Sequence, residues 1–432
     1  MKPEIPLQWI KNEHALQNPR SSLAQELFPP GLPQRIRELH SEIPSYGMSP
    51  LKSLPALARR LGVGGIWVKD ESARFSLNSF KVLGGSYAIY KKLLQRSQLT
   101  DENLTLHDLL NLDGELRKGL GSPIFATATD GNHGTGVAWA ASKMGFRSII
   151  YVHHRTTKDR IEGIKRNGGE VVIVDGNYDD AVRQVNDDAR RNGWEVISDT
   201  SWRGYEDVPK WIMQGYSTMF VETQEQFAAQ GIRRPTHLFV QAGVGSLAAA
   251  AIGYYSVLFE DNVPLSVVVE PTKAACLYKS MEINDGQPHN VTGELDTIMA
   301  GLACGEPNPL AWETLYNCAD FFAICPDYVA AKAMRVYGMP LPGDPFIVSG
   351  ESGAVTLGAL MFAMEYDGAR QLREELSLNR DSQVLLINSE GTLHPKSSAV
   401  WCGRAACPCR KNLKFITTRK TAGHVLKKQS SL

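Results

Sequence analysis

From residue 123 onward, short apolar segments alternate with longer segments of helical periodicity, and this alternation limits the possible folds more than any other feature. Apolar strands joined by crossover helices are typical of parallel sheets that are covered on both faces. The predicted fold class is therefore α/β, with two open parallel-rich sheets flanked by helices. The predicted strands are 66–71, 124–128, 148–152, 171–174, 194–197, 237–241, 266–270 and 384–388.

Segments with apolar residues at helical spacing lie between these strands. A polar, leucine-spaced stretch over residues 101–118 predicts a pair of surface helices. The other predicted helices are 33–40, one that ends near residue 62, 134–144, 158–167, 178–192, 208–230 and 246–258.

The length and charge of the chain argue against several classes of function. Its 432 residues suffice for two domains, and 46 basic residues balance 46 acidic ones, so no nucleic-acid partner is expected. No apolar run is long enough to span a bilayer, the N-terminus does not resemble a signal peptide, and no membrane partner is expected. Seven cysteines do not make a disulfide scaffold in a chain of this size, so a cytoplasmic location is expected.

Lys81 follows the strand predicted over residues 66–71 and lies in the first turn of a predicted helix. Asn78 and Ser79, just before it, are residue types that cap helix N-termini. The helix dipole disfavours a cation in this turn, so the position suits a lysine that reacts. Phe80 would desolvate the amine and favour its neutral, nucleophilic form. Lys81 is therefore a candidate nucleophile, and a solvated helix lysine is the alternative.

The turn over residues 129–134 follows a predicted strand and opens a helix, which is where open α/β sheets bind ligands. Asp130 and Asn132 would project at that point, whereas His133 is expected to be structural. A turn rich in Asp and Asn also occurs as a simple helix cap, which is the alternative interpretation.

The turn over residues 241–246 reads Gln-Ala-Gly-Val-Gly-Ser and again connects a strand to a helix. Backbone N–H groups of Gly243, Val244, Gly245 and Ser246 would form a cradle for phosphate, assisted by the helix dipole. The turn lacks the full dinucleotide fingerprint and the lysine of a P-loop. It is therefore compatible with a single phosphomonoester.

Together these elements describe a site for pyridoxal 5′-phosphate (PLP). Lys81 would meet the aldehyde, Asn132 the 3′-oxygen and the glycine turn the phosphate. Ser389, just past the last predicted strand, would meet the pyridine nitrogen. A serine would leave that nitrogen largely unprotonated, which suits β-elimination better than transamination. No metal is expected.

The sequence resembles the fold-type II PLP enzymes, such as tryptophan synthase β and the serine/threonine dehydratases. The residues that carry this resemblance are Ser79-Phe80-Lys81, Gly131-Asn132-His133 and the glycine turn. More closely, it is similar to the diaminopropionate ammonia-lyase family from about residue 41 to residue 391. The matching strings are RFSLNSFKVLGG (74–85), TDGNHG (129–134), DTSW (199–202), GYED (204–207), AGVG (242–245), IMAGLACGEP (298–307) and SGESG (349–353).

The closer resemblance implies conversion of an amino-acid substrate, 2,3-diaminopropionate, into pyruvate and two ammonia molecules. It implies that Lys81 forms the Schiff base and removes the α-proton of the L-isomer, and that Asp130 is the base for the D-isomer. Asp199 would support the distal amine of the substrate. A homodimer is also implied. The implied cofactor-binding residues are Phe80, Lys81, Asn132, Gly243, Val244, Gly245, Ser246 and Ser389.

We expect a discontinuous large PLP-binding domain over residues 1–85 and 205–392 and a small α/β domain over residues 86–204. The chain departs from the family pattern after Gly391, where Thr-Leu-His-Pro replaces the usual Asp-Thr. The tail over residues 393–432 is basic and has no acidic residue, and it is predicted to be disordered or atypical rather than a basic anchor or metal-binding appendage.

Three questions stay open at the level of sequence. Cys276 and Cys304 fall in regions that line the site in relatives, and either a redox link or two separate buried thiols would fit, with thiols favoured. A PLP-dependent serine/threonine dehydratase is the nearest alternative function. A catalytically inactive PLP-fold protein is the alternative from another class.

Overall fold

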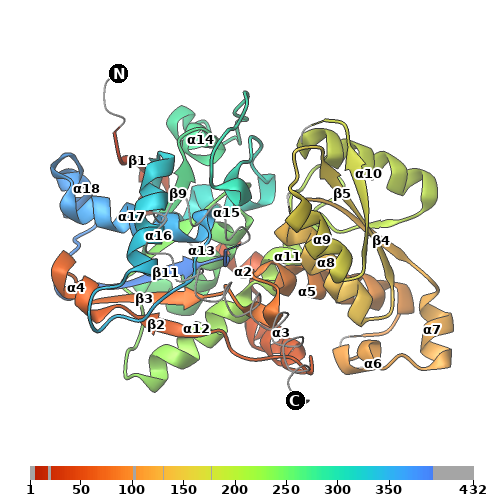
Figure 1. The fold of residues 1–432 in the computed structure, drawn as a ribbon. Coiled ribbons are helices and arrows are strands. Elements are labelled where there is room, and N and C mark those ends of the chain that lie inside the picture. Colours follow the sequence, from red (N-terminus) through yellow and green to blue (C-terminus); the bar gives the residue numbers. More distant parts are fainter. Residues whose placement is uncertain (1–4, 18–20, 101–103, 130, 177, 393–432) are drawn as a thin grey trace, which may run out of the picture.

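The computed structural model describes residues 5–17, 21–100, 104–129, 131–176 and 178–392. These residues form two sheets that lie side by side, each with helices around it (Figure 1). The predicted α/β class with two open, parallel-rich sheets is confirmed. Asp130 and the tail over residues 393–432 lie outside the described residues.

The larger sheet has seven strands in the order β1-β10-β9-β8-β11-β3-β2. The strands from β10 to β3 are parallel, whereas β1 and β2 pair antiparallel at the two edges. Their bounds are β1 Gln8–Lys11, β2 Leu51–Ser53, β3 Gly65–Asp70, β8 His237–Gln241, β9 Leu265–Pro271, β10 Phe321–Cys325 and β11 Gln383–Asn388.

Alternate residues of the central strands enter opposite layers of the core. Val240 of β8 and Val268 of β9 pack with the helices α11, α13 and α15, whereas Phe239 and Val267 pack with α4, α16 and α17. Because both faces are covered, these strands are buried on both sides and rich in apolar residues. The bounds of these helices are α4 Pro55–Leu61, α11 Asp207–Gly215, α13 Ser246–Phe259, α15 Pro309–Cys318, α16 Asp327–Gly338 and α17 Glu351–Glu365.

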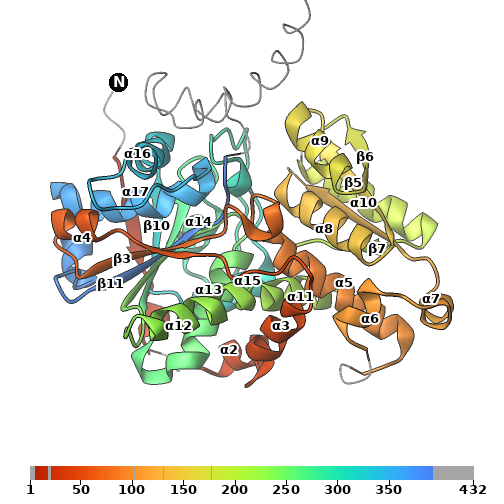
Figure 2. The same ribbon diagram turned by 60° about the horizontal axis from the view of Figure 1, so that its bottom comes forward.

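The smaller sheet has four parallel strands in the order β6-β5-β4-β7. Helices α8 and α9 cover one face and α10 covers the other (Figure 2). The bounds are β4 Ile124–Thr129, β5 Arg147–His153, β6 Gly169–Val174, β7 Glu195–Val196, α8 Asn132–Lys143, α9 Lys158–Arg166 and α10 Tyr178–Asn192.

Helix α5, Lys81–Ser97, packs against α8 on one side and α11, Asp207–Gly215, on the other. Two glycines permit the close approach. A Cβ on Gly84 of α5 would lie 2.6 Å from the ring of Tyr216, and a Cβ on Gly136 of α8 would lie 2.9 Å from the backbone of Val82. No side chain fits at such distances, so glycine is required where these helices meet.

Two helices differ from their predictions. Helix α5 begins at Lys81, and Phe80, rather than Asn78 or Ser79, occupies the N-cap position and makes no side-chain cap bond. Ser79 lies just outside the helix, and its Oγ accepts a hydrogen bond of 3.2 Å from the backbone N–H of Lys81. The helix predicted over residues 208–230 is in fact two helices that meet at Tyr216.

The remaining helices surround these layers, and no helix among the described residues is long and apolar enough to cross a membrane. They are α1 Glu13–Gln17, α2 Ser21–Leu27, α3 Leu32–Ser41, α6 Leu106–Leu110, α7 Gly114–Leu120, α12 Ser217–Ala229, α14 Cys276–Ile283 and α18 Arg370–Glu375. Short 3₁₀ turns are η1 Arg74–Ser76, η2 Glu260–Asn262, η3 Ala300–Leu302 and η4 Asp367–Ala369.

Candidate active site

The predicted site residues gather where the carboxyl ends of the two sheets meet. Lys81, after β3, forms an ion pair with Asp199, which follows β7 of the smaller sheet. Ser246, after β8, donates a hydrogen bond of 2.8 Å to the carbonyl of Asp199. The backbone N–H of Phe80 donates to the carbonyl of Ser389, after β11, over 3.3 Å. Residues that follow strands of both sheets therefore lie together in one candidate site.

The Lys81 Nζ lies 2.5 Å from Asp199 Oδ2, and the two side chains are only 21% and 10% exposed. Burial raises the pKa of Asp199, but the positive charge of Lys81 and the neighbouring His133 lower it by more, so this pKa lies below its ordinary value. The ionised carboxylate also compensates for a cation at the N-terminus of α5, where the helix dipole is unfavourable.

Two aromatic rings border the Lys81 amine. Its Nζ lies 5.5 Å from the centroid of the Phe80 ring and 6.0 Å from that of Tyr216. The two rings pack edge to face with centroids 4.7 Å apart, and both are buried. Both distances are within the range of cation–π attraction, and the rings exclude water from one side of the amine.

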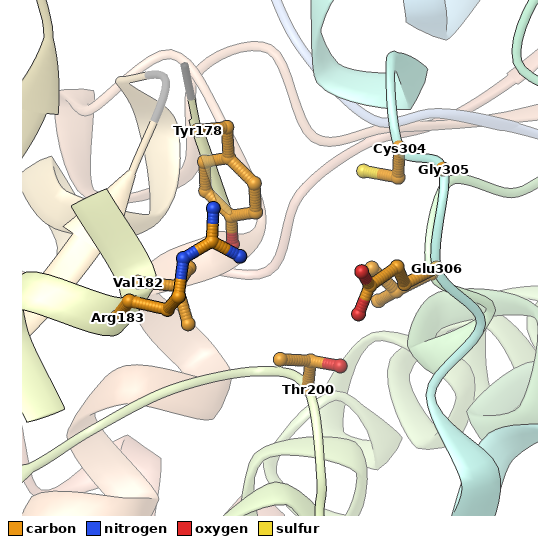
Figure 3. Close-up of a pocket in the computed structure, with 8 residues that line it drawn as sticks. Tyr178, Val182, Arg183, Thr200, Cys304, Gly305 and Glu306 are labelled. Carbon is orange, nitrogen blue, oxygen red and sulfur yellow. The ribbon is translucent and has the colours of Figure 1, made fainter. Parts of the chain in front are cut away.

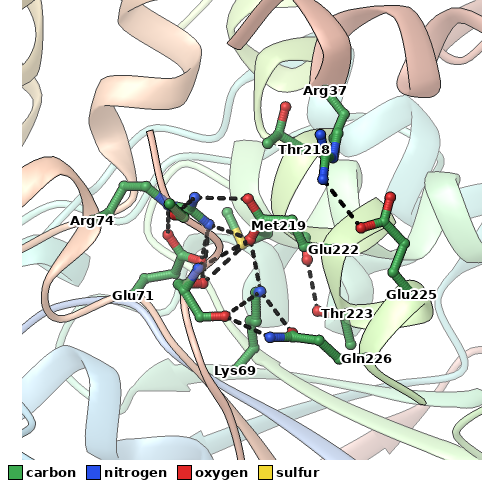
Figure 4. Close-up of polar contacts among 12 residues, drawn as sticks. Arg37, Lys69, Glu71, Arg74, Thr218, Met219, Glu222, Thr223, Glu225 and Gln226 are labelled. Atoms are coloured by element: carbon green, nitrogen blue, oxygen red, sulfur yellow. Dashed lines mark hydrogen bonds and ion pairs between the residues drawn. The ribbon is translucent and has the colours of Figure 1, made fainter. Parts of the chain in front are cut away.

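A buried ion cluster holds the segment that leads into Lys81 (Figure 4). Arg74 lies 2.8 Å from Glu71 and 2.6 Å from Glu222, and Lys69 lies 2.7 Å from Glu222, with all four side chains fully buried. Burial raises the pKa of Glu222, but the hydrogen bond from Arg74 and the charge of Lys69 lower it by more. The cluster therefore links β3 and η1 to α12.

The backbone between this cluster and Lys81 is strained. Phe75, Ser76 and Asn78 have φ angles of 49°, 61° and 64°, which side chains with a Cβ rarely adopt. Each such residue costs about 1–3 kcal/mol and persists only where its surroundings hold it in place. The buried ions before the strained residues and the bonds to the end of β11 after them hold Lys81 in its position.

The glycine turn connects β8 to α13. Gly245 has a φ of 103°, a conformation that favours glycine. A Cβ on Gly243 would lie 3.0 Å from Cys304 Sγ, so any larger residue would intrude on the space in front of the turn. The Ser246 hydroxyl donates to a backbone carbonyl, so its contribution to anion binding would come from its N–H at the start of α13.

Ser389 lies at the end of β11, and its Oγ receives a hydrogen bond of 2.7 Å from Gln241 Nε2. The same nitrogen donates to the carbonyl of Ile387 over 3.1 Å, which fixes the orientation of the amide because a carbonyl can only accept. The hydroxyl proton of Ser389 is therefore available for another acceptor. A serine that donates suits an unprotonated ring nitrogen.

Asn132 begins α8, and its Nδ2 donates a hydrogen bond of 2.6 Å to Glu390 Oε2. His133 Nε2 bonds the carbonyl of Ile197 over 2.8 Å, which agrees with the structural role expected for it. The sequence motifs assigned no role to Glu390, Gln241 or Tyr216. The available signal is their position, since the first two lie at the carboxyl ends of central strands.

The residues at this junction fit PLP. Two buried polar atoms, Ser352 Oγ and Gln241 Oε1, have no hydrogen-bond partner among the described residues, and they lie beside Glu390 and Ser389. The narrow space before Gly243 adjoins the N-terminus of α13, which suits a phosphate. A lysine, an anion-binding turn and a donating serine are the chemistry that the cofactor requires.

A cavity of about 110 Å³ opens beside the site (Figure 3). Arg183 and Tyr178 of α10 form one wall, and Cys304 and Glu306 face them across the space. Thr200, the neighbour of Asp199, borders it as well. The cavity thus lies between the two sheet units and has both signs of charge on its walls.

Within the described residues, Cys276 and Cys304 are present as thiols rather than as a disulfide. Cys276 is buried, its Sγ donates to the carbonyl of Gly243, and burial raises the pKa of this thiol. The described residues also contain no cluster of His, Cys, Asp or Glu that could hold a metal ion.

Comparisons with known proteins agree with this site. The profile of the family described as pyridoxal-phosphate dependent enzyme matches residues 43–390. The chain is 46% identical to the diaminopropionate ammonia-lyase of Escherichia coli strain K12 over 383 residues, which cover 88% of this chain and 94% of that protein.

Solved structures of the diaminopropionate ammonia-lyase of Escherichia coli are similar as well. The selenomethionine holo form matches with a TM-score of 0.85 and 43% identity, over 92% of this chain and 97% of that one. The complex with D-serine matches with a TM-score of 0.84 and 42% identity, over 93% and 98%. Fold and site therefore define a PLP-dependent enzyme of fold-type II. Within that class the chain belongs to the diaminopropionate ammonia-lyase family, which confirms the resemblance seen in the sequence.

Proposed function

We propose that this chain catalyses the PLP-dependent α,β-elimination of 2,3-diaminopropionate to pyruvate and two ammonia molecules. The observation that carries the proposal is the ion pair of Lys81 and Asp199 at the junction of the two sheets. A carboxylate here suits a substrate whose leaving group is an amine. A dehydratase that releases a hydroxyl group has less need of this charge.

When bound, PLP supplies an aldehyde that holds the substrate amine and a ring that delocalises the electron pair left by the α-proton. Lys81 moves the α-proton of the L-isomer on its own face. Asp199, which is ionised in its pair with Lys81, stabilises the distal ammonium of the substrate. Asp130 is assigned, from its sequence position alone, as the base that takes the α-proton of the D-isomer on the opposite face.

The chain's other site residues bind and orient the cofactor. The N–H groups of Gly243, Val244, Gly245 and Ser246 hold the phosphate at the start of α13. The Asn132 amide donates to the 3′-oxygen. Phe80 forms a wall beside the lysine, and the Ser389 hydroxyl donates to the ring nitrogen and keeps it unprotonated, as its bond from Gln241 supports. The site residues assigned here are Phe80, Lys81, Asp130, Asn132, Asp199, Gly243, Val244, Gly245, Ser246 and Ser389.

We also infer a homodimer in the cytoplasm, with a discontinuous large domain over residues 1–85 and 205–392 and a small domain over residues 86–204. The resemblance to the family supports the dimer, and the composition supports the location. Light scattering coupled to size exclusion tests the dimer, and a mass equal to one chain would contradict it.

Pyruvate release from purified protein tests the reaction. D- and L-2,3-diaminopropionate are compared with D- and L-serine, and absorption spectra record bound PLP. We expect kcat/KM for diaminopropionate to exceed that for serine by at least about tenfold, which corresponds to about 1.4 kcal/mol of differential transition-state binding. Faster turnover of serine would favour the dehydratase. Bound PLP without pyruvate from any substrate would favour the inactive protein.

A further inference from the structure

The carboxylate of Glu390 lies between the N-termini of two helices that belong to different sheets. Its Oε2 accepts the hydrogen bond from Asn132 Nδ2 at 2.6 Å, at the start of α8. Its Oε1 accepts a hydrogen bond of 3.2 Å from the backbone N–H of Ser352, in the first turn of α17. Both helix dipoles favour a negative charge at this point.

The backbone around Glu390 is fixed on both sides. Its carbonyl accepts from the N–H of Gly350 over 3.0 Å, and the next residue, Gly391, donates to the carbonyl of Asn78 over 2.9 Å. A bridge also joins Glu390 to Ser79, two residues before Lys81. Glu390 is 5% exposed, so its side chain has little freedom.

Gly350 leaves the space that the Glu390 side chain fills. A Cβ on Gly350 would lie 2.8 Å from Glu390 Oε1 and 2.8 Å from the carbonyl oxygen of Gly391, and the backbone oxygen cannot move aside as a side chain could. This close approach explains why the SGESG string at residues 349–353 has a glycine at position 350. The string leaves room for the Glu390 carboxylate, and its Ser352 N–H donates a hydrogen bond to that carboxylate.

The chemistry of the two groups decides how Asn132 is oriented. A carboxylate can only accept, so the NH₂ end of the Asn132 amide must face Glu390. That nitrogen carries two N–H groups, and Glu390 Oε2 takes one of them. An amide without this partner can turn its carbonyl oxygen to the same place at small cost, which would repel an anionic oxygen.

We propose that Glu390 is the positioning residue for Asn132. It holds the amide with its NH₂ end toward the site, so that the remaining N–H is presented to the 3′-oxygen of PLP. The inference rests on the proposed function, in which Asn132 meets that oxygen. Glu390 itself acts through Asn132 and makes no contact with substrate in this assignment.

The test compares purified holoproteins of the wild type, Asn132→Ala, Glu390→Gln and the double variant. Glu365→Gln is the matched control, because it removes a carboxylate at the far end of α17. Two quantities are measured for each protein: the dissociation constant of PLP and the pH midpoint of its visible absorption band at saturating PLP. A hydrogen bond to the oxygen anion favours that anion, so its loss raises the midpoint.

We expect Glu390→Gln to weaken PLP binding about tenfold, which is the size of a hydrogen bond to a charged group. We also expect its midpoint to rise as in Asn132→Ala, with no further rise in the double variant. Glu365→Gln should keep the wild-type values.

A wild-type midpoint for Glu390→Gln, beside a raised midpoint for Asn132→Ala, would overturn the inference. An unchanged midpoint in Asn132→Ala would overturn it too, because Asn132 would then not meet the oxygen. Failure of the proposed function looks different, since the wild type would bind PLP but release no pyruvate from diaminopropionate.

Discussion

Lys81 Nζ and Asp199 Oδ2 lie 2.5 Å apart, although 118 residues of chain separate them and they follow strands of different sheets. The contact depends on the facing carboxyl ends of β3 and β7. The Asp199 carboxylate compensates for the Lys81 cation, which the dipole of α5 disfavours in its first turn.

Replacing Lys81 by alanine should abolish covalent attachment of PLP. Borohydride reduction followed by mass spectrometry should show the PLP adduct on a peptide that contains Lys81 in the wild type and none in the variant. Turnover should fall by at least about a thousandfold, as for loss of a covalent catalyst. Lys118→Ala, on the exposed surface of α7, is the control and should keep both the adduct and the activity.

Asp199 should make the cofactor-free protein sensitive to acid. Its pKa in the folded state lies below the unfolded value of about 3.9, so the stability from its pair with Lys81 is present above about pH 4 and is lost as the pH falls below it. Thermal unfolding midpoints between pH 6 and about pH 3 should fall more steeply in the wild type than in Asp199→Asn. Equal slopes for both proteins would show that the pair does not contribute.

Asp130→Asn should separate the two isomers of the substrate. If Asp130 takes the α-proton of the D-isomer, kcat for D-diaminopropionate should fall about 100-fold or more, while kcat for the L-isomer changes by less than about threefold. Pyruvate release from each pure isomer measures both. Equal losses for the two isomers would contradict the assignment of two bases.

Glu222→Gln should destabilise the protein far more than Glu225→Gln, although both carboxylates lie on α12. Glu222 is fully buried with Arg74 and Lys69, so removing its charge leaves two buried cations undercompensated and should cost about 3–5 kcal/mol. Glu225 pairs with Arg37 at a partly exposed position and should contribute less than about 1 kcal/mol. Urea unfolding gives both free energies, and similar values for the two variants would refute the prediction.

Gly84→Ala should disrupt the packing of α5. The new methyl group would lie 2.6 Å from the ring of Tyr216, and such overpacking costs about 1–3 kcal/mol. Gly119→Ala, on exposed α7 with no atom within 4 Å of its Cβ, is the control and should stabilise the protein by about 0.5–1 kcal/mol. Urea unfolding measures both variants. If Gly84→Ala lowered the free energy of unfolding by less than about 1 kcal/mol, α5 and α11 would be able to move apart to make room for the methyl group.

The fold class could be predicted because the central strands of both sheets are buried on two faces and therefore stand out as runs rich in apolar residues. In open α/β sheets, ligands bind at the carboxyl ends of the strands. This rule also located Lys81, Asn132 and Ser389, which each follow a strand or begin a helix. Glu390 could not be predicted as a partner of Asn132, because 258 residues separate them and neither flanking segment has a pattern that specifies the contact.

Two helix predictions differed from the structure because of tertiary contacts: the cap of α5 and the single helix over residues 208–230. Local preference favoured a cap at Asn78 or Ser79, but backbone bonds to the end of β11 hold these residues outside the helix. The division at Tyr216 follows the close packing of α11 on α5. A Cβ on Gly215 would lie 2.5 Å from the carbonyl of Leu83, a constraint that no local pattern in residues 208–230 displays.

The glycines that let α5 meet both α8 and α11 also bear on how the two sheets can move. A helix that two neighbours approach to backbone distance cannot slide along either of them without losing that contact. Rotation about the axis of such a helix is the motion that remains. We expect any closure of the smaller sheet toward the larger one to turn about α5. Lys81, at the start of α5, would then move little, the wall of α10 would move more, and the bond from Asn132 to Glu390 would limit how far α8 can turn.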